Sequence, residues 1–461
     1  MPNIENIKKY KNIHMIGIGG VSMSGIAAIL SNLGFTVTGS DRSSSVNTDK
    51  LISMGIKVVI GHDLADIASS DVVIYTAAIK QDDPEILEAK RLNIPTIERA
   101  DFLGELTRCF KDTICISGTH GKTTTTSMVA LCFLEALQDP SIQVGAVLKQ
   151  LDGNYRVGTS EHFIIEACEY VESFLKFFPK TEVILNIDND HLDYFKDLEH
   201  IKTSFAKYVR LLPDDGLLVL NADDANSSHL SRFTTAKTIT YGIKNEHANF
   251  FARNIQFDQN GFASFDVYFN NTFYKTIKLS VPGIHNVSNA LACICVCYVY
   301  GLEKEDIKNG LLKFTGAHRR FEFVGSFNNV NVYDDYGHHP TEITATANAL
   351  KNKKYNQSWV IFQPHTYSRT KNLLKDFAKA LINFDNIIIT DIYAAREKNT
   401  YNISSKDLAE EVAALGKKAY YMPSFSEIVN FVHTHAISND IVITQGAGTI
   451  TKVGPMLVTK K

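Results

Sequence analysis

Strand-like runs that are each followed by a helical pattern recur along the whole 461-residue chain. This alternation is typical of parallel sheets covered by helices, because parallel strands need a crossover connection, which is usually a helix. The pattern starts afresh twice, which predicts three α/β domains at residues 1–109, 110–315 and 316–461. Between Phe250 and Val281 the residues instead alternate between apolar and polar around Asn-containing turns, which predicts antiparallel hairpins added to the second domain.

Composition excludes several classes of protein. The chain is 44% hydrophobic and 21% charged, which is ordinary for globular domains. Its 47 Lys and Arg against 50 Asp and Glu give a net charge of -3, so no overall basic field attracts nucleic acid or an acidic membrane. The first residues lack the order of a secretory signal, and no apolar run reaches the ~18 to 20 residues of a membrane helix. We therefore expect a cytoplasmic protein without nucleic-acid or membrane partners.

The cysteines predict packing rather than chemistry. There are seven, and none forms a CxxC pair. Cys293, Cys295 and Cys297 alternate in an apolar run of helical length, where their i, i+2, i+4 spacing cannot bring all three to one helix face. We expect reduced core residues and neither a disulfide framework nor a zinc site.

The strongest chemical signal is the segment GTHGKTT, which follows a strand and opens a long helix. Its glycines let backbone N–H groups turn inward, and the helix N-terminus adds partial positive charge. Lys122 would reach the β- and γ-phosphates of a nucleotide, and Thr123 would bind Mg²⁺. The spacing GxxGK[ST] is two residues shorter than the general phosphate-loop pattern, but strand, glycines, Lys-Thr and helix occur together. The expected nucleotide contacts are Gly118, Thr119, His120, Gly121, Lys122, Thr123 and Thr124.

A second glycine-rich turn, GIGGVSMSG, follows the first strand. Gly17, Gly19 and the later Asp41 match a dinucleotide-binding pattern, but Ser22 stands at the position of its third glycine. Three interpretations stay open: a nicotinamide dinucleotide site, a diphosphate site for another nucleotide, and a tight turn without ligand. The phosphate loop downstream favours the second.

Carboxylates and histidines follow other strands of the second domain. Glu166 ends one strand, and Asp190 and His191 follow the next. The carboxyl ends of parallel strands face one crevice, so we expect these residues near the phosphate loop. Glu166 suits Mg²⁺, which prefers oxygen ligands. His191 is open between a metal ligand, a hydrogen-bond partner of phosphate or carboxylate, and part of a polar cluster that caps a helix.

The third domain gathers charged residues directly after its strands. So many His, Arg and Asp residues on one sheet edge indicate a site for a charged substrate. Arg319 and Arg320, at the hinge into this domain, fit a charge that stabilises a transferring phosphoryl group. The residues on the edge are Asp334, Asp335, His338, His339, His365, Arg369 and Arg396.

Six segments, taken in order, resemble the Mur ligases over nearly the whole chain: GTHGKTTT, LNIDNDHLDYF, PGIHNVSNALA, AHRRFE, DDYGHHPTE and FQPHTYSRT. The resemblance implies a Rossmann-like N-terminal domain for the UDP part of a substrate, a central phosphate-loop ATPase domain, and a Rossmann-like C-terminal domain that brings an amino acid. It implies ATP and Mg²⁺ as cofactors. The lactoyl carboxylate of UDP-N-acetylmuramate would form an acyl phosphate, which L-alanine then attacks, in peptidoglycan precursor synthesis.

The resemblance also implies roles for individual residues. Lys122 would contact the ATP phosphates, Thr123 one Mg²⁺, and Glu166 with His191 a second Mg²⁺. The catalytic set would be Lys122, His191, Arg320, His338 and Arg369, with His338 as general base.

The remaining implied contacts are to ATP and to the sugar nucleotide. His285, Asn286 and Asn289 would surround the adenine, Asp335 would touch the ribose, and Arg320 would neutralise the γ-phosphate. The substrate contacts would be Gly17, Gly19, Gly20, Ser22 and Asp41 for the UDP part, and His338, His339 and Arg369 for the muramoyl carboxylate and alanine.

Three other functions stay open. A sister ligase that attaches a preformed peptide to the same sugar nucleotide, as in wall recycling, shares most of these motifs. A nicotinamide-dependent oxidoreductase is supported by the N-terminal turn and Asp41, but it leaves GTHGKTT unexplained. A motor or switch NTPase would not need the charged edge of the third domain.

Overall fold

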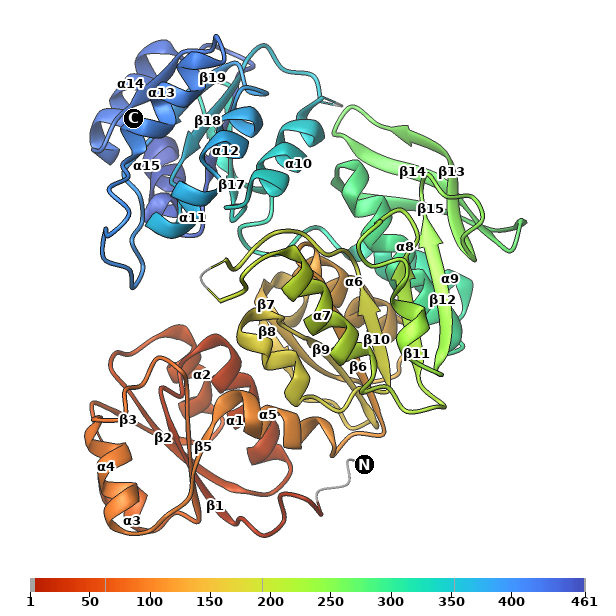
Figure 1. Cartoon of the computed structure of the whole chain (residues 1–461), viewed down its shortest axis with the longest axis vertical. Helices are drawn as coiled ribbons and strands as arrows, with labels where there is room; N and C mark the ends of the chain where they lie inside the picture. The colour runs from red at the N-terminus through yellow and green to blue at the C-terminus, as the bar shows by residue number, and fades with distance from the viewer. Residues whose placement is uncertain (1–4, 63, 193, 352, 460–461) are drawn as a thin grey trace.

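The computed structural model describes residues 5–62, 64–192, 194–351 and 353–459, and these form three lobes in chain order (Figure 1). Each lobe is built on one sheet in which most neighbouring strands are parallel, which confirms the predicted fold class. The second sheet starts at Asp112 and the third at Glu322 in sequence, whereas the exact domain boundaries stay predictions. No helix among the described residues is long and apolar enough to span a bilayer.

The N-terminal lobe has a five-stranded parallel sheet of order β3-β2-β1-β4-β5. Its strands are β1 (Asn12–Ile16), β2 (Thr36–Asp41), β3 (Lys57–Ile60), β4 (Val72–Tyr75) and β5 (Thr96–Glu98). Its helices are α1 (Val21–Asn32), α2 (Val46–Ser53), α3 (Leu64–Ala68), α4 (Pro84–Arg91) and α5 (Arg99–Thr107).

The central lobe has a ten-stranded sheet of order β15-β14-β13-β12-β11-β10-β6-β9-β7-β8. Its parallel part is β6 (Asp112–Ser117), β7 (Ser141–Leu148), β9 (His162–Glu166), β10 (Thr181–Ile184), β11 (Leu217–Asn221) and β12 (Lys237–Gly242). The predicted hairpins are present as β13 (Phe250–Phe257), β14 (Phe262–Phe269) and β15 (Thr272–Pro282), and β8 (Gly153–Arg156) pairs antiparallel with β7.

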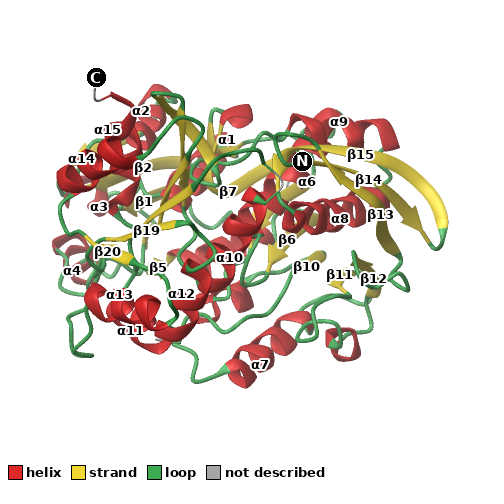
Figure 2. Cartoon of the chain, turned by 90° about the horizontal axis from the view of Figure 1, so that it is seen from above, coloured by secondary structure: helices red, strands yellow, loops and turns green. Residues whose placement is uncertain are grey.

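Helices cover both faces of this central sheet. Figure 2 shows α7 on one side of β10 and β11 and both α6 and α8 on the other. The α-helices are α6 (Lys122–Glu135), α7 (Leu198–Val209), α8 (Ile284–Val299) and α9 (Lys304–Lys313), and the short 3-10 helices are η1 (Lys149–Leu151), η2 (Tyr170–Lys176) and η3 (Leu230–Phe233).

The C-terminal lobe has a six-stranded sheet of order β16-β17-β21-β18-β19-β20, in which only the pair β16 and β17 is antiparallel among the described strands. Its strands are β16 (Glu322–Phe327), β17 (Val330–Asp335), β18 (Ser358–Phe362), β19 (Asn386–Ile389), β20 (Ala419–Tyr421) and β21 (Ile441–Gln445). Its helices are α10 (Pro340–Leu350), α11 (Tyr367–Asn372), α12 (Leu374–Leu381), α13 (Ser405–Ala414), α14 (Phe425–His435), η4 (Thr449–Lys452) and α15 (Val453–Thr459).

The two joints between lobes differ in chemistry. Apolar residues of the N-terminal lobe, such as Ile26 and Leu106, belong to the same buried cluster as Tyr155 and Phe163 of the central lobe. The C-terminal lobe instead has clusters of its own. The N-terminal lobe is therefore joined to the central lobe by a shared core, whereas the C-terminal lobe meets the central lobe through the polar contacts described below.

Strand β10, in the middle of the central sheet, carries an unusual buried carboxyl group. Glu182 is fully buried, and neither of its side-chain oxygens has a hydrogen-bond partner among the described residues. Burial raises the pKa of Glu182 well above its usual value. Because the charged form is costly in this core, burial favours the protonated form of Glu182.

Replacing Glu182 is expected to stabilise the protein more as the pH rises. The pKa of Glu182 in the folded state lies above the unfolded value of about 4.3. The free energy of unfolding that comes from keeping Glu182 protonated is therefore fully present below that pH and is lost as the pH rises. Glu182→Met should raise the free energy of unfolding by ~1–3 kcal/mol at pH 8 and by less at pH 5. Calorimetric melting at both pH values measures this.

The matched control is Glu199→Met, since the side chain of Glu199 is 79% exposed. That variant should melt like the parent protein at both pH values. A gain for Glu182→Met that did not depend on pH would contradict a protonated, unpaired carboxyl group.

Candidate functional site

The phosphate loop lies where the sequence predicts, between β6 and α6. Gly118 and Gly121 have φ values of 131° and 88°, a region that favours glycine. A side chain at Gly121 would also meet the Asn289 side-chain oxygen at 2.7 Å, because α8 approaches the loop closely. Lys122 is the first residue of α6, so its ammonium group lies at the helix N-terminus with the loop.

An acidic partner that the sequence analysis missed holds Lys122. The Lys122 ammonium donates hydrogen bonds to the Glu169 carboxylate at 2.8 and 3.1 Å and to the carbonyl oxygens of Gly118 and Thr119. Burial lowers the pKa of Lys122, but Glu169 outweighs this effect and raises it. Glu169 follows Glu166 by three residues, and that spacing in EACEYVESFL was the available signal.

Thr123 and Glu166 lie in direct contact, although the resemblance implies that they bind two different Mg²⁺ ions. The Thr123 hydroxyl donates to the Glu166 carboxylate at 3.2 Å, and the backbone N–H of Gly145 donates to the other carboxylate oxygen at 2.5 Å. Burial raises the pKa of Glu166, although these two bonds and Lys122 act in the opposite direction.

His191 lies near two other carboxylates of the central lobe. Its Nε2 is 3.9 Å from Glu169 and 4.0 Å from Asp190, and its ring packs on Tyr170 with centroids 4.7 Å apart. Its φ is 55°, which is uncommon for a residue other than glycine. His191 and Glu166 line the same pocket.

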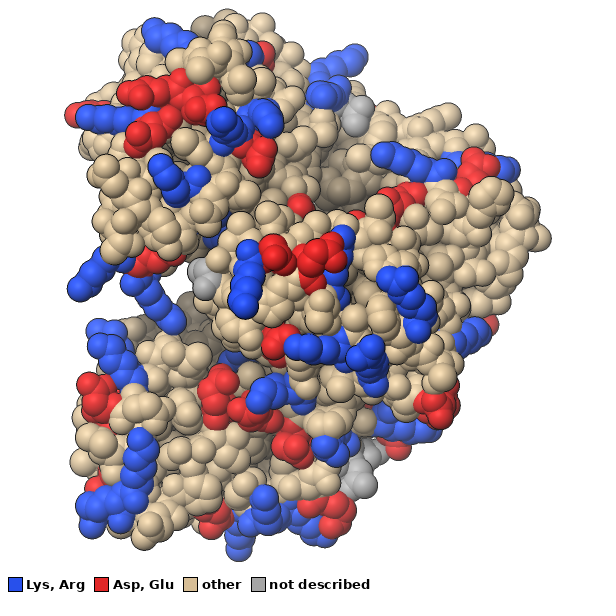
Figure 3. All heavy atoms as spheres, in the orientation of Figure 1, with Lys and Arg blue, Asp and Glu red and all other residues tan. Residues whose placement is uncertain are grey.

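The five residues expected to be catalytic converge on one pocket between the central and C-terminal lobes, which we call the reaction pocket. Figure 3 shows that the molecular surface is hollowed between these two lobes. Thr123, Glu166, His365 and Arg396 line this pocket as well. The expected catalytic residues in its wall are Lys122, His191, Arg320, His338 and Arg369.

A second pocket adjoins the first and collects the residues expected to bind the nucleotide; we call it the nucleotide pocket. The two pockets share His120, Gly121, Arg320 and Glu342. The N-terminus of α8 forms one wall and α10 another. The expected nucleotide contacts that line it are His120, Gly121, Thr124, His285, Asn286, Asn289, Arg320 and Asp335.

Two side chains in these walls have clear electrostatic states. Burial and the positive charge of Arg320 lower the pKa of His285 to about 4. Burial also lowers the pKa of His338 to about 4, although Glu342 acts against this. His338 Nδ1 lies 3.1 Å from the Tyr336 carbonyl oxygen, so in the neutral ring this nitrogen carries the proton and Nε2 keeps a lone pair.

The structure leaves some expected residues outside both pockets. His339 caps α10 and its Nε2 lies 3.2 Å from the Asn189 carbonyl oxygen. In the N-terminal lobe, Asp41 accepts a hydrogen bond from the Gly19 N–H at 2.9 Å. Ser22 accepts one from Gln143 of the central lobe at 2.6 Å. The expected site residues that line neither pocket among the described residues are Gly17, Gly19, Gly20, Ser22, Asp41, Gly118 and His339.

The loop after β10 holds the C-terminal lobe against the central lobe. Asp188 lies 3.1 Å from His120 Nε2 and accepts a hydrogen bond from the Thr341 hydroxyl at 2.6 Å. Asp190 accepts from the Arg369 guanidinium at 2.8 Å. Burial lowers the pKa of His120, but Asp188 and Glu342 outweigh it and raise this pKa to about 9. His120 is therefore charged at neutral pH.

Comparisons with known proteins cover all three lobes. Residues 12–111 match the profile "Mur ligase family, catalytic domain", residues 116–297 the "Mur ligase middle domain", and residues 319–448 the "Mur ligase, glutamate ligase domain". The chain is 51% identical over 453 residues to UDP-N-acetylmuramate--L-alanine ligase of Acetivibrio thermocellus, covering 98% of this chain and 97% of that protein. It is 49% identical over 450 residues to the ligase of the same name from Clostridium botulinum, covering 98% of each.

Solved structures agree with these matches. The crystal structure of UDP-N-acetylmuramate-alanine ligase from Thermotoga maritima superposes with a TM-score of 0.80 at 30% identity, covering 97% of this chain and 98% of that one. A murein peptide ligase from Psychrobacter arcticus superposes with a TM-score of 0.70 at 25% identity, with the same coverage.

Docking of the C-terminal lobe is expected to weaken as the pH rises through about 9. The pKa of His120 is raised to about 9, above its usual value of about 6.5. The attraction of its charge to Glu342, which crosses the joint, is therefore fully present below pH ~6.5 and is lost above pH ~9. The radius of gyration from X-ray scattering, measured without nucleotide, should increase between pH 7 and pH 10.

Asp188→Asn is the comparison for this experiment, because it removes a charge of the central lobe that raises the pKa of His120. At pH 7 this variant should already have a larger radius of gyration than the parent protein, and its radius should change less between pH 7 and pH 10. An equal pH response in both proteins would assign the change to other groups.

Proposed function

The chain belongs to the Mur ligase family, and from that premise we propose that it joins L-alanine to the lactoyl carboxylate of UDP-N-acetylmuramate. As a member of this family it is an ATP-dependent, ADP-forming amide ligase. The observation that carries the proposal is the convergence of Lys122, Arg320, His338 and Arg369 on one pocket that opens into a nucleotide pocket. The product would enter peptidoglycan precursor synthesis.

ATP would lie across the two pockets. Its adenine would occupy the nucleotide pocket against His285, Asn286 and Asn289, with the ribose near Asp335. Its phosphates would lie on the loop at the N-terminus of α6, where backbone N–H groups and the helix dipole favour negative charge. Lys122 would exchange Glu169 for the phosphates, so the cation is already in place before ATP binds.

The oxygen donors of the reaction pocket fit Mg²⁺. Thr123 and Glu166 already lie within 3.2 Å of each other beside Lys122, and hydroxyl and carboxylate oxygens are the ligands that Mg²⁺ prefers. We assign them as ligands, with His191 at the edge of the same group. A bound Mg²⁺ would neutralise charge on the phosphates and on the acyl phosphate.

The chemistry has two steps, and this chain's residues position the reactants for both. The carboxylate of the sugar nucleotide attacks the γ-phosphorus, ADP leaves, and an acyl phosphate forms. The amine of L-alanine then attacks the acyl carbon, and phosphate leaves. Arg320 and Lys122 would offset the negative charges that must approach each other. His338, neutral with a free Nε2 lone pair, would accept the proton from the amine.

Two charged substrate groups remain to be placed. Arg369 lines the reaction pocket while it binds Asp190, so it would bind the muramoyl carboxylate or the carboxylate of alanine from that fixed position.

The UDP part would lie on the N-terminal lobe, at the turn that contains Gly17, Gly20 and Ser22. The bond from the Gly19 N–H to Asp41 gives this turn a fixed shape before the substrate binds. His339 would act through its cap on α10.

The alternative functions have less support. The murein peptide ligase superposes less well than the alanine ligase, and the curated relatives at about 50% identity carry the alanine ligase name. Of the N-terminal turn, Val21 lines the reaction pocket, whereas Gly17, Gly19 and Asp41 line neither pocket among the described residues. A nicotinamide site would also leave the phosphate loop with Lys122 and Thr123 without a role. A motor or switch NTPase leaves His338 and Arg369 in the reaction pocket without a role.

Phosphate release is expected only when UDP-N-acetylmuramate, L-alanine, ATP and Mg²⁺ are all present. Release with a tripeptide in place of L-alanine would favour the sister ligase, and release with neither acceptor nor amine would contradict ligase function.

Lys122→Ala should lower turnover by at least ~1000-fold, because the ATP phosphates would lose the cation that positions them. Lys308→Ala, which changes an exposed lysine of α9, serves as the control and should leave turnover unchanged.

His191→Ala is expected to lower turnover by ~10- to 100-fold and to raise the Mg²⁺ concentration needed for half-maximal rate. A Mg²⁺ titration of both proteins at saturating ATP measures this shift. His200→Ala, which changes a histidine of α7, is the matched control. A variant with lower turnover but an unchanged Mg²⁺ dependence would place His191 outside the metal site.

A further inference from the structure

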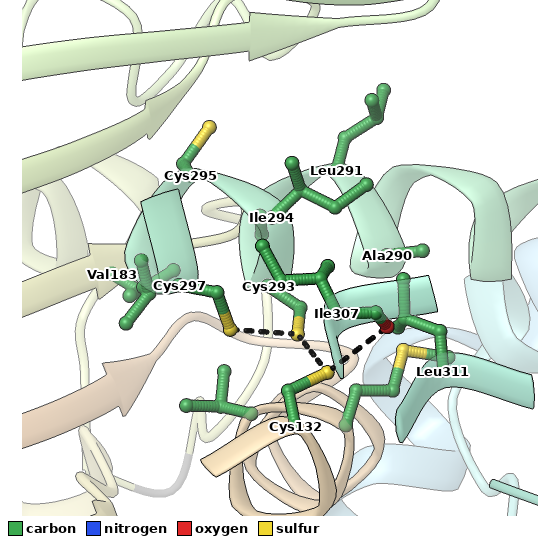
Figure 4. Close-up of a cluster of buried hydrophobic side chains, with 14 of the residues drawn as sticks. Cys132, Val183, Ala290, Leu291, Cys293, Ile294, Cys295, Cys297, Ile307 and Leu311 are labelled. Carbon is green, nitrogen blue, oxygen red and sulfur yellow. Dashed lines mark hydrogen bonds between the residues drawn. The ribbon is translucent and has the colours of Figure 1, made fainter. Parts of the chain in front are cut away.

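Three cysteine thiols meet in the core between α6 and α8. Figure 4 shows Cys132 of α6 facing Cys293 and Cys297 of α8, while Cys295 points away from them. The sulfur atoms of Cys132 and Cys293 are 3.7 Å apart, and those of Cys293 and Cys297 are 3.8 Å apart. The i, i+4 pair shares a helix face, as the spacing predicts, but the sequence analysis did not foresee Cys132 opposite it.

The spacing of these sulfurs is that of a set of metal ligands. The three sulfur atoms all lie within 4.8 Å of one another. Three sulfur bonds of about 2.3 Å to one ion hold the sulfurs about 3.3 to 4.0 Å apart for bond angles of about 90° to 120°. Two of the three edges therefore already have the length that a thiophilic ion imposes, and the ligands come from two helices that pack directly on each other.

The surroundings restrict the charge that such an ion can carry. All three cysteines are fully buried, and Val183, Ile294 and other apolar side chains surround them. The negative charge of Glu135 disfavours the thiolate form of Cys132. Burying net charge in such a core is costly.

We propose that Cys132, Cys293 and Cys297 form a three-thiol site for a soft thiophilic ion of the trivalent arsenite class. Neutral As(OH)₃ reacts with three neutral thiols to give neutral As(SR)₃ and three waters. Three As–O and three S–H bonds break, three As–S and three O–H bonds form, and no oxidation state changes. Zn²⁺ with three thiolates would leave one net negative charge in the core, and Cu⁺ would leave two.

The three thiols are closed off from solvent, because all three cysteines are fully buried. A Cβ at Gly310 of α9 would lie 2.8 Å from the Cys132 sulfur, so α9 closes over this side of the site and uptake requires local opening. Uptake should therefore be slow and faster on warming.

The site is placed to affect the nucleotide pocket. Cys132 lies ten residues after Lys122 on α6, or ~15 Å along the helix. Cys293 lies four residues after Asn289 on α8, or ~6 Å along the helix. An ion bound to the three thiols would link α6 to α8 and fix their relative position. The N-terminal ends of these two helices lie at the phosphate loop and at the expected adenine contacts.

The test is arsenite uptake by the full chain, reduced beforehand with a phosphine so that no competing dithiol is present. Native mass spectrometry after desalting should show one arsenic per chain. Cys295→Ala removes a buried cysteine of the same helix, and Cys168→Ala removes an exposed one. Both should bind like the parent protein, whereas Cys132→Ala, Cys293→Ala and Cys297→Ala should each bind at least tenfold less.

X-ray absorption at the arsenic edge tests the same point without any substitution, so it does not depend on how the variants fold. Three sulfur neighbours are expected. Fewer sulfurs, unchanged uptake by the three variants, or equal loss of uptake by Cys295→Ala would overturn the site. Parallel samples with Zn²⁺ and Cu⁺ should lose the metal on desalting, and retention of either by these three cysteines would overturn the assignment to the arsenite class.

Discussion

The reaction pocket depends on the polar contact between the loop after β10 and the C-terminal lobe. Asp188 and Asp190 hold this lobe through Thr341 and Arg369. The lobe supplies much of the wall of the pocket, including His338. If these contacts opened, Lys122 would remain on the phosphate loop with Glu169 but without Arg320, His338 and Arg369. The site therefore exists as a unit only while two carboxylates of one loop stay paired across the joint.

The other joint has the opposite character. The N-terminal and central lobes share an apolar cluster that includes Tyr155 and Phe163. Separating these lobes would expose apolar surface to water, at ~25 cal/mol per Å². The polar contacts at the C-terminal joint can be replaced by water at a much smaller net cost. The C-terminal lobe is thus attached by the joint that is easier to open.

The near-neutral composition also has a local explanation. Each cation assigned to an anionic ligand already has a carboxylate partner: Lys122 binds Glu169, Arg369 binds Asp190, and Arg320 lies 3.4 Å from Glu342. These pairs keep the cations in position and limit the repulsion between them. Figure 3 shows the same intermixing of both signs on the visible surface. Net charge therefore carries little information about a site that binds two anionic substrates.

The sequence by itself determined the three α/β sheets, the added hairpins and the phosphate loop, because each is written in a local pattern of strand, turn and helix. The ordered motifs also indicated which residues to examine, and most of them line the two pockets. Only the tertiary structure decided that Glu169 holds Lys122, that Glu182 is buried without a hydrogen-bond partner among the described residues, and that Cys132 meets Cys293 and Cys297. These contacts join segments far apart in sequence or depend on which face of an element is covered, and packing between elements, not local pattern, fixes such geometry.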